Sequence, residues 1–165
     1  KTAIRDDNPV IFVEGQLLYG LKGVVPQDDY LIPFGEANIV KNGKDITIIA
    51  WGPALQDAIK AADQLSTEGI SVELIDPRTL IPFDWTTVEE SVKKTGRAIV
   101  VSQCVDIGSY TGEIVSGIVE RCFDYLDAPV IKIGAKNGIA PQAYTLEKAY
   151  LPDANDIVSA AKKLF

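Results

Sequence analysis

The sequence predicts an α/β fold of three layers, α/β/α, with a mostly parallel sheet of about five strands and one antiparallel edge strand. Short strands that are apolar throughout alternate with amphipathic helices from residue 46 onward. This pattern is typical of a parallel sheet that helices cover on both faces. Residues 36–40 and 45–50 flank Lys41-Asn42-Gly43-Lys44, where Asn-Gly favours a tight hairpin turn. This hairpin predicts the antiparallel edge strand.

The remaining elements alternate regularly along the chain. Parallel strands are expected at residues 46–50, 72–75, 98–101 and 130–133, and helices are expected to begin at Pro53, Asp84, Tyr110 and Asp153. Asp84 can cap its helix through Thr87, and Gly96 ends that helix. The helix after Tyr110 should bury Ile114, Val115, Ile118, Val119 and Cys122, and the last helix should run from Asp153 to Phe165.

Length and composition indicate one well-buried domain with a short leading segment, since the chain has 165 residues and is 47 % hydrophobic. The net charge of −7 disfavours a nucleic-acid partner. No stretch is apolar enough for a membrane helix or a signal peptide, so we expect a soluble, cytoplasmic protein. The chain does not begin with Met, which predicts that it is processed or excised from a longer polypeptide.

The first 35 residues differ in character from the rest. Pro9–Val13 has the composition of a strand but no local partner, so we expect it to belong to a neighbouring sheet. Residues 14–33 mix glycine, proline and large apolar groups without the periodicity of a helix or a strand. This predicts a linker that packs against another surface. Together with Pro9–Val13, the apolar linker residues should leave an exposed patch that drives self-association; they are Leu17, Leu18, Tyr19 and Leu21.

Ligands of open parallel sheets favour the carboxyl ends of the strands. Gly108, Ser109 and Gly112 follow one such end and open a helix, so their free amides are a weak candidate for anion binding. The alternative is a tight turn that needs glycine only for close packing. No nucleophile–base pair, carboxylate dyad or metal-ligand set emerges, and the chain has no histidine. We therefore predict no catalytic, cofactor-binding or metal residues in this chain.

Two charged residues are candidates for contacts with a partner. Arg78 lies in a loop that Pro77 and Pro82 stiffen, and an ion pair across a subunit interface is favoured over a substrate role. Glu14 follows the first strand candidate beside a glycine; it could act as an acid or base, but a polar contact at a domain junction is favoured. Cys104 and Cys122 are expected to be buried free thiols.

Five short segments, taken in order, resemble one enzyme family. They are Asn8-Pro-Val-Ile-Phe-Val-Glu14, Gln16-Leu-Leu-Tyr-Gly20, Tyr30-Leu-Ile-Pro-Phe-Gly-Glu-Ala37, Asp76-Pro-Arg-Thr-Leu-Ile-Pro-Phe-Asp84 and Leu126-Asp-Ala-Pro-Val130. Together they are similar to the β subunit of thiamine-diphosphate-dependent 2-oxoacid dehydrogenases, the pyruvate or branched-chain E1 components. Two segments depart from the family pattern: Glu14-Gly-Gln-Leu17 stands where many relatives have Glu-Asn-Glu-Leu, and Ser102–Ser109 where they have an acidic, Trp-containing loop.

The resemblance implies a transketolase-like C-terminal domain at residues 36–165, preceded at residues 1–35 by the tail of a pyrimidine-binding domain and a linker. Thiamine diphosphate and Mg²⁺ would be held by other parts of the parent enzyme. The implied partners are the E1 α subunit, a second β subunit and the lipoyl-bearing E2 acyltransferase. The implied E2 contact lies at the C-terminal helix and Phe165, where the negative net charge would suit a basic partner.

Two alternatives stay open at the level of sequence. The chain could be a free-standing, doubly wound binding or regulatory module that uses the Gly108–Gly112 turn. It could also be the related domain of a 2-oxoacid:ferredoxin oxidoreductase or of 1-deoxyxylulose-5-phosphate synthase.

Overall fold

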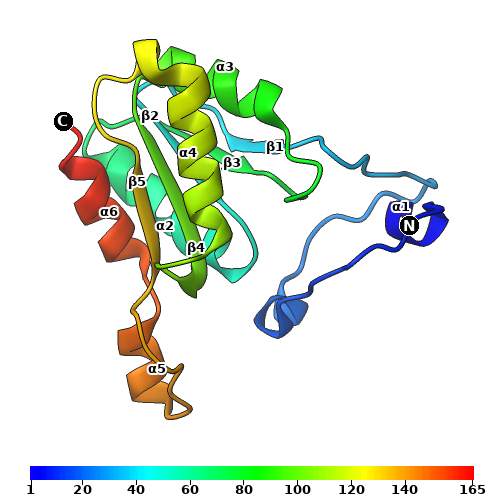
Figure 1. Ribbon diagram of the computed structural model, residues 1–165. Helices are drawn as coiled ribbons and strands as arrows, with labels where there is room; N and C mark the ends of the chain where they lie inside the picture. Colours follow the sequence, from blue (N-terminus) through cyan, green and yellow to red (C-terminus); the bar gives the residue numbers. More distant parts are fainter.

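A computed structural model describes all residues from Lys1 to Phe165 and shows a five-stranded sheet between two layers of helices (Figure 1). The strand order is β1-β3-β2-β4-β5. The four parallel strands are β2 (Ile46–Ala50), β3 (Val72–Asp76), β4 (Ala98–Val105) and β5 (Ile131–Ala135), and β1 (Asn38–Lys41) is antiparallel at one edge. The predicted fold class is confirmed.

Alternate residues of the strands face two separate apolar layers. Ile48, Leu74 and Ile99 pack beneath α2 (Pro53–Thr67) and α6 (Ala154–Lys162). Their neighbours Ile49 and Ile75 pack beneath α3 (Trp85–Thr95) and α4 (Tyr110–Cys122). Because β2 and the first five residues of β4 are buried on both faces, the period of two that marks a half-buried strand is absent from their sequences.

The ends of α3 and α6 are formed by the capping residues that the sequence predicts. The Asp84 carboxylate accepts the Thr87 N–H at 3.0 Å, and Gly96 ends α3 with φ of +68°, a conformation that L side chains rarely adopt. Asp153 and Asp156 form a reciprocal capping box at the start of α6. The local sequence therefore determines where these helices begin and end.

The predicted hairpin is wrong. β1 pairs with β3, and β2 lies at the centre of the sheet between β3 and β4. Gly43 lies directly on the backbone of Val72 and Glu73, where a Cβ atom would overlap it. Asn42-Gly43 thus carries the chain across β3 instead of folding it back onto β2.

Several shorter predictions also need correction. Pro9–Val13 forms no strand within this chain, and its expected place in a neighbouring sheet stays a prediction. Cys104 is exposed, since β4 continues beyond the body of the sheet as far as Val105, while Cys122 is buried as expected. Val119 lies on the exposed side of α4.

The structure adds four short helices: α1 (Thr2–Arg5), η1 (Gln16–Gly20), η2 (Phe123–Tyr125), which directly follows α4, and α5 (Tyr144–Tyr150). The sequence did not predict α5, which has no buried residue and so no apolar stripe that faces a core. None of the helices combines the length and apolar character that a membrane crossing requires.

Candidate functional site

The carboxyl ends of the parallel strands form one edge of the sheet, and most of the predicted site residues lie at or beyond it. Arg78 follows β3, and Gly108 and Ser109 follow β4. β1 is antiparallel, with Asn38 opposite Asp76, so the chain that precedes β1 leaves from this same edge. This carboxyl edge is the candidate functional site.

The loop from Asp76 to Asp84 holds Arg78 in a fixed place. Arg78 has φ of +56°, and its N–H donates to the Asp76 carboxylate at 3.0 Å. The Thr79 hydroxyl donates to the Pro82 carbonyl at 2.7 Å, which closes the loop on itself. A positive φ at a residue other than glycine persists only where its surroundings hold it, and such residues concentrate at functional positions.

Neighbouring elements clamp this loop at three points. The Gly35 N–H donates to the Thr79 hydroxyl oxygen at 2.9 Å, and the Ala37 N–H donates to the Asp84 carboxylate at 2.9 Å. From α4, the Tyr110 hydroxyl donates to the Leu80 carbonyl at 2.8 Å. The Arg78 side chain is nevertheless exposed and joins no ion pair within the chain. A rigid loop therefore presents a guanidinium group that is free to pair with another molecule.

Beneath Arg78, burial raises the pKa of the Asp76 carboxyl group above its ordinary value. The Arg78 N–H and the Arg78 charge oppose this change only in part. The carboxylate orients the Arg78 backbone without neutralising the guanidinium through a direct ion pair.

The turn after β4 is compact. Gly108 has φ of +74°, and the Gly112 N–H donates to the Ser109 carbonyl at 3.0 Å. The Ser109 and Thr111 hydroxyls hydrogen-bond to each other, and Ser109 makes no side-chain cap. The amide of Gly112 is thus already used within the turn.

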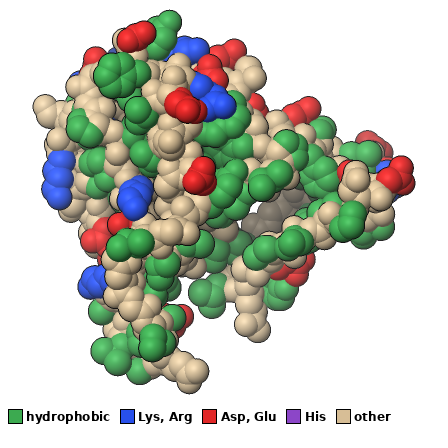
Figure 2. All heavy atoms as spheres, in the orientation of Figure 1, with side chains coloured by type: hydrophobic (Ala, Val, Ile, Leu, Met, Phe, Trp, Pro, Cys, Tyr) green, Lys and Arg blue, Asp and Glu red, His purple; other side chains and the backbone are tan.

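Residues 1–35 form a loop that projects from the sheet domain, which we call the hook (Figure 1). Its two ends are tied together, because Lys1 and Arg5 pair with Asp29 at 2.7 and 3.1 Å and the Thr2 hydroxyl donates to the Ile32 carbonyl. Figure 2 shows hydrophobic side chains along the hook and an open hollow between it and the rest of the molecule. The hook has a defined shape although no residue in it is buried.

Apolar groups of the hook are largely in solvent: Ile11 is 92 % exposed, Val13 87 % and Leu17 80 %. Within the hook, the Tyr19 hydroxyl donates to the Glu14 carboxylate. This bond and the charge of Glu14 raise the pKa of Tyr19. Glu14 and Tyr19 therefore stabilise a local turn of the hook. Large exposed apolar side chains gathered on one segment are typical of an interaction site.

Phe165 lies at the opposite, amino edge of the sheet. The Arg97 guanidinium lies 4.6 Å from the centre of the Phe165 ring, and its Nε donates to the Leu164 carbonyl at 2.8 Å. Arg97 also pairs with Asp127 at 3.3 Å. The structure thus divides the predicted interface residues between two surfaces, with Arg78, Glu14 and Tyr19 on the side of the hook and Phe165 on the other.

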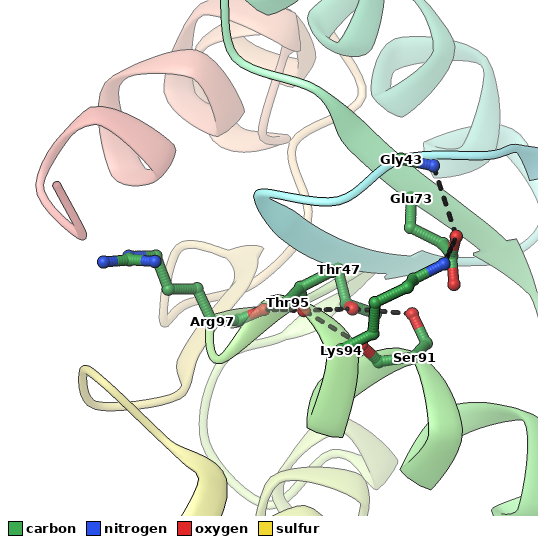
Figure 3. A network of polar contacts seen from close by, with 7 residues as sticks. All are labelled: Gly43, Thr47, Glu73, Ser91, Lys94, Thr95 and Arg97. Atoms are coloured by element: carbon green, nitrogen blue, oxygen red, sulfur yellow. Dashed lines mark hydrogen bonds and ion pairs between the residues drawn. The ribbon is translucent and has the colours of Figure 1, made fainter.

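A buried polar network lies beneath α3 (Figure 3). The Glu73 side chain is 2 % exposed; it pairs with Lys94 and accepts the Gly43 N–H at 3.2 Å. Burial disfavours its ionisation, but hydrogen bonds from Lys94, Gly43 and Ser91 outweigh burial and lower the pKa of Glu73. This carboxylate joins the chain after β1 to α3.

The network continues through hydroxyl groups. The Thr47 hydroxyl lies 2.7 Å from that of Ser91 and 2.8 Å from that of Thr95. Sequence reasoning missed this network. A signal was available, because Glu73 interrupts an apolar strand and Ser91 and Thr95 stand four residues apart on the apolar face of α3.

The family resemblance implies a cofactor that carries a diphosphate group and is bound together with a divalent metal ion. Magnesium sites use oxygen ligands, chiefly carboxylates together with substrate phosphates. The chain brings together no group of three or more His, Cys, Asp or Glu side chains that could hold a metal ion. The chain therefore offers no ligand set for the metal ion of that cofactor, and no chemical step through the cofactor follows from its residues.

Comparison with known proteins gives a family match for most of the chain. Residues 35–157 match the family described as transketolase, C-terminal domain. The pyruvate dehydrogenase E1 component subunit beta of Rhizobium meliloti (strain 1021) is 47 % identical over 163 residues, which cover 98 % of this chain and 35 % of that protein. The acetoin:2,6-dichlorophenolindophenol oxidoreductase subunit beta of Cupriavidus necator is 44 % identical over 161 residues, which cover 98 % of this chain and 48 % of that protein.

A solved structure agrees with these matches. A split gene transketolase, described as an inactive beta4 tetramer, has a TM-score of 0.71 and 29 % sequence identity, and the match covers 88 % of this chain and 46 % of that one. The chain spans between about a third and a half of the length of the curated relatives it matches.

Proposed function

Because the chain belongs to the transketolase C-terminal domain family, we propose that it is the C-terminal assembly and partner-docking domain of an E1 β subunit. The parent enzyme would be a pyruvate or branched-chain 2-oxoacid dehydrogenase, which decarboxylates its substrate with thiamine diphosphate and passes the acyl group to lipoyl-E2. The similarity of nearly the whole chain to proteins named as β subunits supports this function over a free-standing regulatory module.

The observation that carries the proposal is the exposed apolar hook at the carboxyl edge. A segment with so many exposed large apolar groups is stable in water only when another surface covers it. We propose that residues 1–35 are the tail of a pyrimidine-binding domain and a linker, and that residues 36–165 are the transketolase-like domain. The family match, which begins at residue 35, supports this division.

We assign thiamine diphosphate and Mg²⁺ to other parts of the assembly. The cofactor supplies the carbanion chemistry of oxoacid decarboxylation when it is bound. This domain would contribute by holding the neighbouring domain and the subunits in register through the rigid Arg78 loop. Arg78 would pair with a carboxylate of an adjacent domain or subunit, because its loop is clamped and its guanidinium has no partner in the chain.

We propose the E1 α subunit, a second β subunit and the E2 acyltransferase as partners, with E2 at the amino edge beside Phe165. The net charge of −7 suits a basic E2 domain. Lys162 and Lys163 at the end of α6 reduce the negative field there. We place the assembled enzyme in the cytoplasm, since Cys104 and Cys122 are free thiols, as is usual in a reducing compartment.

The test is Arg78→Lys in the full-length β subunit expressed with its α subunit. We expect weaker subunit association by analytical ultracentrifugation and nearly unchanged turnover per assembled enzyme, because lysine keeps the charge but loses bidentate pairing. Arg121→Lys is the matched control, since Arg121 packs over Trp85 on α3 within this chain. Unchanged association would remove Arg78 from the interface, and lost turnover in fully assembled enzyme would place it at the active site.

A further inference from the structure

Arg97 joins three separate parts of the chain at the amino edge of the sheet. It stands between α3 and β4, and its backbone carbonyl accepts the Thr47 N–H at 2.9 Å and the Thr95 hydroxyl at 3.2 Å. Figure 3 shows its side chain pointing away from these two residues. The backbone of Arg97 is therefore fixed in the sheet domain, while its guanidinium group is directed to other partners.

The guanidinium group holds Leu164 and Phe165, which lie just beyond α6. Its Nε donates to the Leu164 carbonyl at 2.8 Å, and its central carbon lies 4.6 Å from the centre of the Phe165 ring. A cation at this distance from an aromatic ring is attracted to the face of the ring. Leu164 itself is buried in the core beneath α2 and α6. One hydrogen bond and one cation–π contact therefore fix the Phe165 ring next to a buried residue.

Asp127 orients the guanidinium group from the other side. Arg97 Nη1 lies 3.3 Å from Asp127 Oδ2, and the Asp127 N–H donates to the Gly96 carbonyl at 2.8 Å. A Cβ atom at Gly96 would overlap the Asp127 carboxylate, so glycine is needed for this close approach. The Arg97 side chain is 25 % exposed. Its orientation is thus set within the chain, without a partner.

The Phe165 ring is held in place and yet stays open to solvent. It is 58 % exposed, although Leu164 beside it is buried. Two further aromatic residues, Phe123 and Tyr125, stand in η2 just before Asp127 and are 72 % and 53 % exposed. Aromatic side chains are enriched in protein interfaces relative to the rest of the surface. The amino edge therefore presents an ordered aromatic group to a partner.

We propose that Arg97 is the positioning residue of the E2 contact. It holds the Phe165 ring in one place, so that E2 meets a side chain that is already ordered. Ordering a side chain before a partner arrives lowers the entropy cost of association. This inference rests on the function proposed above, which places E2 beside Phe165. Arg97 acts through Phe165 and makes no contact with E2 of its own.

A double-mutant cycle tests this role in the full-length β subunit expressed with its α subunit. Calorimetry would measure the binding of the E2 acyltransferase to the assembled enzyme. We expect Arg97→Gln to weaken E2 binding about tenfold and Phe165→Ala to weaken it at least tenfold. The double variant should bind within about twofold of Phe165→Ala alone, because Arg97 acts only through the ring. If the two losses multiply, Arg97 contacts E2 independently and the proposal is overturned.

Asp153→Ala separates positioning from a general loss of stability. It removes the capping box at the other end of α6 and leaves Arg97 and Phe165 in place. We expect it to change E2 binding by less than about twofold. Hydrogen exchange in residues 163–165 should be faster in Arg97→Gln and unchanged in Asp153→Ala. Equal weakening of E2 binding by the two variants would show an effect of stability alone and contradict the proposal.

The single variants also separate this inference from the function on which it rests. If Phe165→Ala weakens E2 binding and Arg97→Gln does not, E2 docks at the amino edge but the positioning role of Arg97 is wrong. If Phe165→Ala leaves E2 binding unchanged, E2 does not dock beside Phe165, and the proposed E2 site fails together with the role of Arg97.

Discussion

The hook and the sheet domain differ in how far their apolar side chains are exposed to solvent. No residue of the hook is buried, whereas the 37 buried residues of the chain all lie between residues 46 and 164. More than half of the large exposed hydrophobic side chains belong to the hook. The sheet domain has its own core, while the hook is held by exposed polar contacts between its two ends and by contacts of Gly15 and Gly35 with Pro53 and Thr79 of the sheet domain. We propose that a surface outside this chain covers the apolar side chains of the hook.

Replacing one buried leucine and one leucine of the hook should separate the two regions most clearly. Leu74 is fully buried beneath α2, and Leu17 is 80 % exposed. We expect Leu74→Ala to lower the free energy of unfolding by about 2–5 kcal/mol, because it leaves a cavity in a packed core. Leu17→Ala should change it by less than about 0.5 kcal/mol. Urea unfolding of both variants measures this, and equal losses would show that the hook is part of the core.

The Glu73 network gives a smaller effect that depends on pH. The folded-state pKa of Glu73 lies below its ordinary value of 4.5. The stabilisation is therefore complete above that value and is lost as the pH falls through the folded pKa. We expect Glu73→Gln to cost about 1–3 kcal/mol at neutral pH and much less in strong acid.

Glu90 provides the control, since it is exposed and lines, together with Glu73, a groove between β1 and α3. Glu90→Gln should leave the pH dependence of unfolding unchanged. If Glu73→Gln and wild type lose stability in parallel between pH 6 and pH 3, the network does not control this part of the acid transition.

Asp84 connects the sheet domain to the base of the hook, so its loss should affect both. Asp84→Ala should cost about 1 kcal/mol through the lost cap of α3, and Asp153→Ala should cost a similar amount at α6. Only Asp84→Ala should speed hydrogen exchange in residues 34–37, because its carboxylate also accepts the Ala37 N–H. Equal exchange in the two variants would show that Asp84 acts on the helix alone.

The sequence allowed the sheet domain to be predicted because its signals are local. Asp84, Gly96 and the Asp153–Asp156 box mark helix ends through contacts within a few residues. Strand pairing is not local, which explains why the hairpin prediction failed. Asn42-Gly43 predicts a tight turn with positive φ angles, but the structure has none there, because Gly43 instead packs on the backbone of Val72 and Glu73 about thirty residues away.

The candidate site was predictable in part. Arg78 was identified from its two flanking prolines, and the structure adds the clamps from Gly35 and Tyr110 that hold its loop. The clamps themselves were not predictable, because they join Gly35 to Thr79 and Tyr110 to Leu80, which lie far apart in the sequence.

The smallest change in stability and the clearest change in association should come from the hook itself. Ile11 and Val13 are almost fully exposed, so Ile11→Ser with Val13→Ser removes no internal packing and should leave the free energy of unfolding within about 0.5 kcal/mol of wild type. The same change removes apolar surface that is unfavourable in water, and should reduce self-association at tens of micromolar, a usual range for weak interfaces. Sedimentation velocity compares the variant with Ile139→Ser, which alters a 96 % exposed side chain between β5 and α5. If Ile139→Ser dissociates as readily as the hook variant, self-association follows general apolar exposure and not the hook. If wild type is already monomeric at these concentrations, the hook requires a different partner, and the covering surface must come from the rest of the parent protein.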